Sequence, residues 1–243
     1  MKKIIALILA LCCVFAISSC GFIDGLFGND DEEVDGIAVF KQLYSVSEPT
    51  KVVTNYTTLI GGVTLKGNST LATGAINNGK TATVLTYSYE VLQSVQSGAT
   101  EVVTPIMGDP VTGSREYVEG RGERIDGGAW DAEGQDFAPK AGSIAINLDE
   151  TKLTDCTYSA SGDIKTLSFT VLAENVEAVF GADSEISSDV TVVITANAAV
   201  VTGISISYTE IIESEDEDVE YPTASVTITT VYTYDIEEIT LVK

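Results

Sequence analysis

The chain reads Val226-Thr227-Ile228-Thr229-Thr230-Val231-Tyr232-Thr233-Tyr234 near its carboxyl end. In an extended chain, the larger apolar and aromatic side chains of this stretch fall mostly on one side and threonine falls on the other. Such period-two alternation predicts a β-strand with one buried face and one face in water. Residues 165–171 and 204–209 repeat the alternation, and residues 81–92 are rich in Thr, Val and Tyr. We therefore expect a mainly β protein.

Turn-forming residues separate these strand-like stretches. Gly61-Gly62, Asn78-Gly79 and Ser161-Gly162-Asp163 each lie between two of them. Glycine and asparagine adopt the positive φ angles that tight hairpins need. Consecutive strands are therefore expected to be antiparallel neighbours.

Two segments have helical spacing instead. Residues 37–47 repeat apolar side chains three and four positions apart and end before Pro49. Residues 173–180 place Val176, Val179 and Phe180 on one helical face and are followed by a glycine. These patterns predict one N-terminal helix and one short helix inserted between strands.

The amino terminus has the order of a secretory signal peptide. Met1-Lys2-Lys3 precedes an apolar run from Ile4 to Ile17, which is too short for a stable membrane span. The segment Ile17-Ser18-Ser19-Cys20 resembles the bacterial lipobox, and this resemblance implies that Cys20 becomes the mature N-terminus and carries a diacylglycerol and a fatty acid such as palmitate.

The chain is therefore expected to have three parts. Residues 1–19 are the expected signal peptide, and residues 20–36 are a glycine-rich, then acidic, lipid-anchored tether. Residues 37–243 are expected to form a single mainly β domain. No second long apolar run follows, so the membrane partner is reached through the lipidated cysteine and not through a transmembrane helix.

The charge balance excludes one class of partner. The chain has 36 acidic and 13 basic residues, and its net charge is −23, or −25 once residues 1–19 are removed. Such a body repels the phosphates of nucleic acids, so we expect no nucleic-acid partner.

Cysteine usage rules out an internal disulfide in the mature chain. Cys12 and Cys13 leave with the signal peptide and Cys20 is lipidated, so Cys156 is the only remaining thiol. With no basic neighbour to activate it, Cys156 is expected to be a small buried side chain.

The absence of histidine argues against catalysis. Ser-His-Asp and Cys-His nucleophiles and histidine-ligated zinc all need that residue. Phosphate-binding and dinucleotide-binding glycine motifs are missing as well. We expect no enzyme activity and no cofactor.

Two acidic segments are candidate cation sites. Asp126–Asp136 combines oxygen ligands, glycines and Trp130, but its spacing is not that of a calcium loop. Glu213–Glu220 is dense charge that favours a solvated hairpin loop. We expect no specific metal site. Trp130 either folds back onto the sheet or stacks on a sugar ring.

The lipobox, the antiparallel strands and the inserted helix together resemble the half-barrel lipoproteins of the LolA and LppX type. This resemblance of pattern, over residues 37–243, implies a curved antiparallel sheet with both helices on its concave face and a cavity for acyl chains. A β-sandwich is the alternative fold. The apolar strand and helix faces supply these candidate cavity residues: Leu167, Phe169, Val176, Val179, Phe180, Ile204, Ile206, Tyr208, Val226 and Ile228.

The functional expectation is a non-catalytic lipoprotein on the extracytoplasmic face of a bacterial membrane. It would bind an apolar or amphipathic, lipid-like ligand in the half-barrel cavity. The alternative is a structural or adhesion module of the cell surface that meets polysaccharide or protein with its threonine-rich outer faces. The oligomeric state is left open by the sequence.

Overall fold

A computed structural model describes residues 34–97, 100–106, 108–139, 146–181, 186–211, 223–236 and 238–242. The chain divides into two compact units, Met1–Val34 and Asp35–Lys243, and the fold belongs to the second. The predicted signal peptide, Cys20, most of the tether and the acidic run 213–220 lie outside the described residues. Within the described residues, no helix is long and apolar enough to cross a bilayer.

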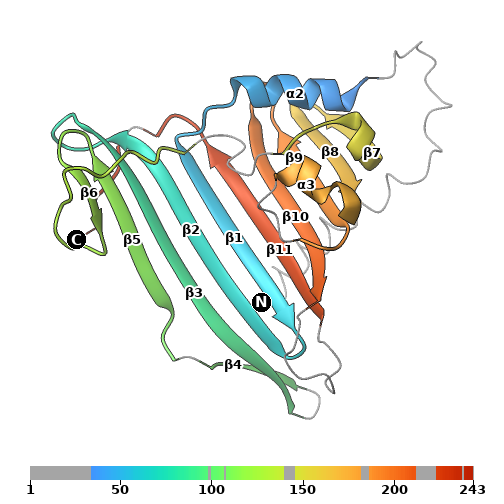
Figure 1. The fold of residues 1–243 in the computed structure, drawn as a ribbon, viewed down its shortest axis with the longest axis horizontal. Helices are drawn as coiled ribbons and strands as arrows, with labels where there is room; N and C mark the ends of the chain where they lie inside the picture. Colours follow the sequence, from blue (N-terminus) through green and yellow to red (C-terminus); the bar gives the residue numbers. More distant parts are fainter. Residues whose placement is uncertain are drawn as a thin grey trace. The chain divides into compact units, whose positions relative to one another are not determined.

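The described strands form one curved, unclosed antiparallel sheet (Figure 1). Their order across the sheet is β6-β5-β3-β2-β1-β11-β10-β9-β8-β7, and β4 pairs with β3 beside this path. The strands are β1 (Lys51–Ile60), β2 (Val63–Ala75), β3 (Thr81–Ser97), β4 (Thr100–Pro105), β5 (Val111–Val118), β6 (Gly122–Ile125), β7 (Thr154–Ser161), β8 (Ile164–Val171), β9 (Val190–Ala196), β10 (Val201–Ile211) and β11 (Thr223–Thr233). The predicted half-barrel is confirmed. The sandwich alternative is wrong, because a single continuous sheet includes all these strands.

The predicted hairpins are confirmed. Ile60 of β1 pairs with Val63 of β2 across Gly61-Gly62, and Gly61 has a φ of +56°. The β7–β8 hairpin closes in the same way around Gly162, whose φ is +59°. In the β2–β3 turn, the side chain of Asn78 accepts a hydrogen bond from the backbone N–H of Lys80. These local turns set the antiparallel order of neighbouring strands.

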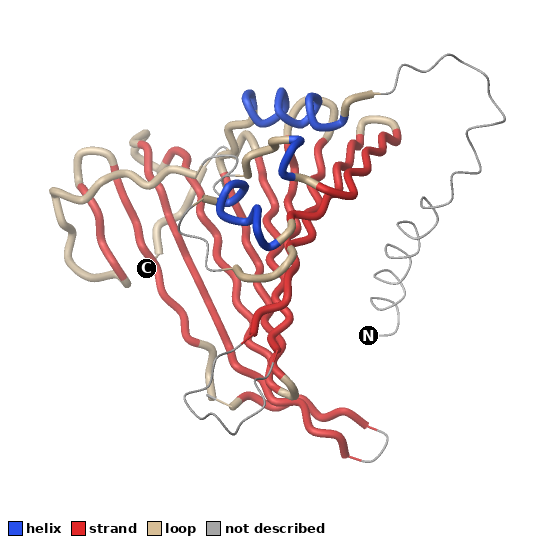
Figure 2. The backbone as a smooth tube through the Cα atoms, turned by 45° about the vertical axis from the view of Figure 1, so that its right-hand side comes forward, coloured by secondary structure: helices blue, strands red, loops and turns tan. Residues whose placement is uncertain are grey.

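Both predicted helices are confirmed. Helix α2 (Gly36–Val46) begins at Asp35, whose carboxylate accepts a hydrogen bond from the N–H of Ala38. A 3₁₀ turn, η2 (Ala173–Asn175), leads into α3 (Val176–Phe180), and Gly181 ends that helix with a φ of +99°. Figure 2 shows both helices on the inner side of the curved sheet.

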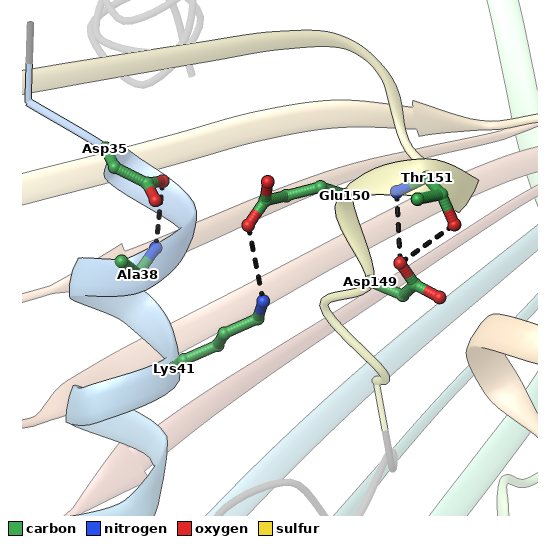
Figure 3. Close-up of polar contacts among 6 residues, drawn as sticks. All are labelled: Asp35, Ala38, Lys41, Asp149, Glu150 and Thr151. Carbon is green, nitrogen blue, oxygen red and sulfur yellow. Dashed lines mark hydrogen bonds and ion pairs between the residues drawn. The ribbon is translucent and has the colours of Figure 1, made fainter.

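Polar contacts attach the exposed side of α2 to the segment before β7 (Figure 3). The ammonium of Lys41 lies 3.5 Å from a carboxylate oxygen of Glu150, which opens the 3₁₀ turn η1 (Glu150–Lys152). Asp149 caps that turn by accepting hydrogen bonds from the N–H and hydroxyl of Thr151, and these bonds lower the pKa of Asp149. Both ion-pair partners are exposed, so the pair orients the helix more than it stabilises it.

The main hydrophobic core lies between the two helices and strands β8–β11. Phe40 of α2 is fully buried, and Val176 and Val179 of α3 pack in the same cluster as Phe169 and Ile194 of the sheet. Burying one such side chain stabilises the fold by about 1.5–3 kcal/mol. The helices therefore act as the second layer that this half of the sheet needs.

The expectation that Cys156 is buried is wrong. Its side chain is exposed on β7, which is the edge strand at one end of the sheet. The pairing register with β8 shifts between Thr154 and Thr157, and Asp155 adopts a φ of +51°. This irregularity breaks the inward-outward alternation and turns Cys156 toward solvent.

Candidate functional site

The strand register extends the concave face beyond the helix-covered core. Val52 of β1 belongs to the core and pairs with Tyr232 of β11 on one side and Leu71 of β2 on the other. Leu71 in turn pairs with Leu85 of β3. Because directly paired residues point to the same face of a sheet, the concave face continues from the core across β2, β3 and β5.

The ten residues predicted to line a cavity all lie on the helix-covered side. Six of them are 1–3% exposed and belong to the core cluster: Leu167, Phe169, Val176, Val179, Ile204 and Ile206. Phe180, Tyr208 and Ile228 are partly buried and pack against that cluster, and Val226 is 7% exposed. Val226 pairs with Tyr208 across β10 and β11. The structure thus brings the predicted set together, with most members packed against one another.

A second apolar surface lies on the concave face of β1, β2, β3 and β5. We call it the open concave surface, and it consists of Tyr56, Leu65, Leu85, Tyr87, Tyr89 and Val111. These side chains are only partly buried, and Tyr87 and Val111 remain 39% and 37% exposed. The surface adjoins the core directly, since Tyr56 pairs with Ile228.

Two glycines support the tyrosines of the open concave surface. A Cβ added at Gly67 would lie 1.8 Å from the Tyr56 ring, and one added at Gly113 would lie 2.1 Å from the Tyr87 hydroxyl. In each pair the phenol end of the tyrosine lies over the bare backbone of its cross-strand neighbour. Aromatic rings over glycine fill the space that a missing side chain leaves and help to hold strand register.

The sequence of β3 carries a signal for this surface. Leu85, Tyr87, Tyr89 and Val91 occupy alternate positions, with Thr86, Ser88 and Glu90 between them. This alternation marks one apolar face on β3. It does not reveal whether a helix covers that face, and only the tertiary structure decides this.

Polar residues border the open concave surface where β5 meets β6. Arg115 forms an ion pair with Glu123, and this hydrogen-bonded contact raises the pKa of the guanidinium. The same guanidinium lies 4.4 Å from the ring centre of Phe137, and Asp136 accepts a 2.6 Å hydrogen bond from the Thr83 hydroxyl. The segment after β6 therefore folds back over this end of the concave face.

The face opposite the helices carries two open hollows. One has a volume of about 330 Å³ and the other of about 610 Å³, and both are lined by Asn68 and Ser88. The remaining polar lining includes Asn55, Thr57, Thr86, Thr112 and Ser114. The lining also includes the charged residues Lys66 and Glu90 in the smaller hollow and Asp126 in the larger one, so both hollows are of mixed polarity.

The Asp126–Asp136 loop uses its oxygens within the protein. Asp126 accepts a 2.6 Å hydrogen bond from the N–H of Ser114, and Asp131 accepts one from the N–H of Glu133. Trp130 folds back, with the guanidinium groups of Arg121 and Arg124 4.1 Å and 4.9 Å from its ring centre. Across the described ranges, no group of three acidic or thiol side chains is arranged to hold a metal ion.

No protein-family profile and no characterised protein matches this chain in sequence. Among solved structures, LprF from Mycobacterium bovis aligns over 83% of this chain and 92% of its own, with 11% identity and a TM-score of 0.32. A DUF1329 family protein from Desulfovibrio piger aligns over the same shares of the two chains, with 9% identity and a TM-score of 0.24. At TM-scores below 0.5, neither likeness assigns a family or a ligand.

Proposed function

We propose that this protein is a non-catalytic, lipid-anchored envelope protein that holds an apolar or amphipathic, lipid-like ligand on the concave face of its half-barrel. The observation that carries the proposal is the open concave surface. It places partly exposed leucine, valine and tyrosine side chains inside an unclosed, curved sheet. Contiguous apolar surface left in contact with water is typical of binding sites.

The chemistry of this surface suits an amphipathic molecule. Leu65, Leu85 and Val111 offer only apolar contact. Tyr56, Tyr87 and Tyr89 add rings with a hydroxyl at one end, which contact an alkyl chain and still satisfy a polar head group. An acyl chain lying along β3 would bury these side chains. Removing their apolar surface from water would contribute hydrophobic free energy to binding.

The predicted cavity residues then form the inner boundary of the site. Ile228 is partly buried and pairs with Tyr56 of the open concave surface, and Tyr208, also partly buried, lies on the next strand, β10. The deeply buried members, such as Phe169, support the sheet. We propose that ligand contact falls mainly on β1–β3 and β5, and that Ile228 and Leu71, which pair with Tyr56 and Leu85, are its nearest neighbours at the core.

The cellular setting rests on Cys20. A diacylglyceryl group there, together with the signal peptide, would place the folded unit on the extracytoplasmic face of a bacterial membrane. The sequence lacks histidine and nucleophile motifs. This agrees with a site at the membrane surface that binds lipid without cleaving it.

Native mass spectrometry and titration with a fluorescent fatty acid test the proposal. The protein purified without detergent should carry lipid or show saturable binding of the probe. Tyr89→Glu should weaken that binding, because it puts a charge on the open concave surface. Leu59→Glu is the matched control, since Leu59 is 46% exposed and points to the opposite face by alternation. Absence of both co-purified lipid and saturable binding would refute the proposed function.

Phe169→Trp locates the ligand within the concave face. Phe169 is 1% exposed, so the larger side chain overpacks the core and should cost about 1–3 kcal/mol. We expect the affinity for the fatty acid to be unchanged. A large loss of affinity in a folded Phe169→Trp protein would place the ligand in the core beneath α3.

A second candidate function is polysaccharide binding on the outer face. The two hollows that share Asn68 and Ser88 favour it, because sugar hydroxyls pair with amide and hydroxyl side chains. Asn68→Ala with Ser88→Ala should then abolish retardation of the protein in gels that contain soluble cell-wall polysaccharide. If the unsubstituted protein already migrates freely in such gels, this candidate is excluded.

A further inference from the structure

The hairpin of β3 and β4 extends beyond the rest of the sheet. Pairing of β2 with β3 stops at Val63 and Gln93, whereas β3 continues to Ser97. The N–H of Ser94 still donates a 2.7 Å hydrogen bond to the carbonyl of Gly62, and beyond Ser94 the described partner of β3 is β4 alone. Figures 1 and 2 show this two-stranded ribbon projecting away from the other strands.

Apolar side chains are exposed on both faces of the hairpin. Val102 and Val103 are 43% and 52% exposed, and adjacent strand residues point to opposite faces. Ile106, just after β4, is 51% exposed, and its N–H donates to the carbonyl of Val91. Because valines lie on both faces of this two-stranded ribbon, one of the two faces leaves apolar surface in water even if the other turns toward the rest of the sheet.

The hairpin also lies in a part of the folded unit that has few acidic residues. Residues 49–100 contain three lysines and one glutamate, in a protein of net charge −23. Between Glu90 and Asp109 the only charged residue is Glu101. The acidic remainder is repelled by anionic head groups, so this charge-poor end can approach a lipid surface most closely.

We propose that Val102, Val103 and Ile106 of the β3–β4 hairpin insert into the surface of a lipid bilayer. A bilayer surrounds an inserted element and covers both of its faces at once. A folded protein partner covers mainly one face and would leave Val102 or Val103 in water. Between Glu90 and Asp109 the ribbon carries one ionisable residue, Glu101, so entry into the head-group region requires the transfer of at most one charge.

Insertion would also orient the ligand site, a consequence that rests on the proposed function. Gln93 pairs with Thr104, so Val102, two residues from Thr104, shares the concave face of β3 with Tyr89 and Val91. The apolar strip of the open concave surface therefore leads along β3 toward the hairpin. A lipid leaving the bilayer would meet this strip first.

Tryptophan quenching tests the insertion directly. In a Trp130→Phe background, which has no other tryptophan, Val103→Trp is introduced into the full chain. The protein is mixed with phosphatidylcholine vesicles that carry bromine on their acyl chains. We expect the emission of Val103→Trp to shift to shorter wavelength and to lose intensity. Ile164→Trp is the control, because Ile164 is 61% exposed at the β7–β8 hairpin near the other sheet edge.

Three results would overturn the proposal. The first is equal behaviour of Val103→Trp and Ile164→Trp with brominated vesicles. The second is a blue shift of Val103→Trp without vesicles that grows with protein concentration, which indicates pairing between copies. If Trp130→Phe does not fold, a nitrobenzoxadiazole dye is attached instead to Val103→Cys in a Cys156→Ser background. The third overturning result is then a dye emission that vesicles leave unchanged. None of these fluorescence measurements needs a bound ligand. Failure of the insertion proposal is therefore distinguishable from failure of the proposed function, which the fatty-acid titration tests.

Discussion

The guanidinium of Arg124 on β6 donates a hydrogen bond to the fully buried carboxylate of Glu116 on β5. The second oxygen of that carboxylate accepts a 2.6 Å hydrogen bond from the N–H of Val242, and Arg124 also donates to the carbonyl of Val242. The ion pair thus binds the end of the chain to the outer face of β5 and β6. No sequence motif marks these residues.

Removing one partner of this pair should be far worse than removing both. Arg124→Met leaves the Glu116 charge buried and uncompensated, and we expect it to lower the free energy of unfolding by about 3–5 kcal/mol. Glu116→Leu combined with Arg124→Met should be closer to the unsubstituted protein. Urea denaturation measures both. A double variant as unstable as Arg124→Met alone would show that the buried charge is not the cause.

The tyrosine–glycine pairs predict a specific steric effect. Gly67→Ala should displace the Tyr56 ring and destabilise the fold by about 1–3 kcal/mol, because the added Cβ overlaps that ring. In a Tyr56→Ala background the same substitution should cost much less, since the space is then empty. Thermal denaturation of the four proteins completes the cycle, and additive effects would contradict direct contact between the two residues.

Tyr44 on α2 predicts a change at alkaline pH. Among the described residues its buried hydroxyl has no hydrogen-bond partner, and burial, with smaller contributions from Tyr232 and Tyr234, raises its pKa. Unfolded chains release a tyrosine proton near pH 10, whereas folded Tyr44 keeps it, so stability should fall as the pH rises above about 10.

Tyr44→Phe should reduce that alkaline loss of stability. At pH 7 it should stabilise the protein by about 1 kcal/mol, because it removes an unsatisfied buried hydroxyl. Guanidinium denaturation at pH 7 and pH 10.5 provides the comparison. An equal loss of stability with pH in both proteins would mean that other groups cause the alkaline effect.

The anchor prediction concerns Cys20, outside the described residues. Cys20→Ser should abolish labelling by a radioactive fatty acid and move the protein out of the detergent phase, because serine lacks the thiol that is lipidated. Cys156→Ser should retain both properties, since Cys156 lies in the folded unit. A Cys20→Ser protein that still partitions into detergent at the mature size would contradict lipidation at this position.

The sequence by itself determined the elements of this fold. Alternation placed Leu167, Phe169 and Ile206 on buried faces, and glycine turns such as Gly61-Gly62 set the hairpins. Helix α3 and its glycine stop followed from local spacing as well. These predictions succeeded because hairpins, turns and short helices depend on neighbours within a few residues.

Only the tertiary structure determines which face of each strand is covered and which is exposed. Val52 enters the core because β1 pairs with β11, which brings it opposite Tyr232 from 180 residues along the chain. Cys156 is exposed because β7 is an edge strand, and Glu116 is buried because the end of the chain crosses β5. Alternation separates the two faces of a strand, but which face is covered depends on strand order and on distant segments. For that reason the open concave surface and the projecting β3–β4 hairpin became visible only in the folded chain.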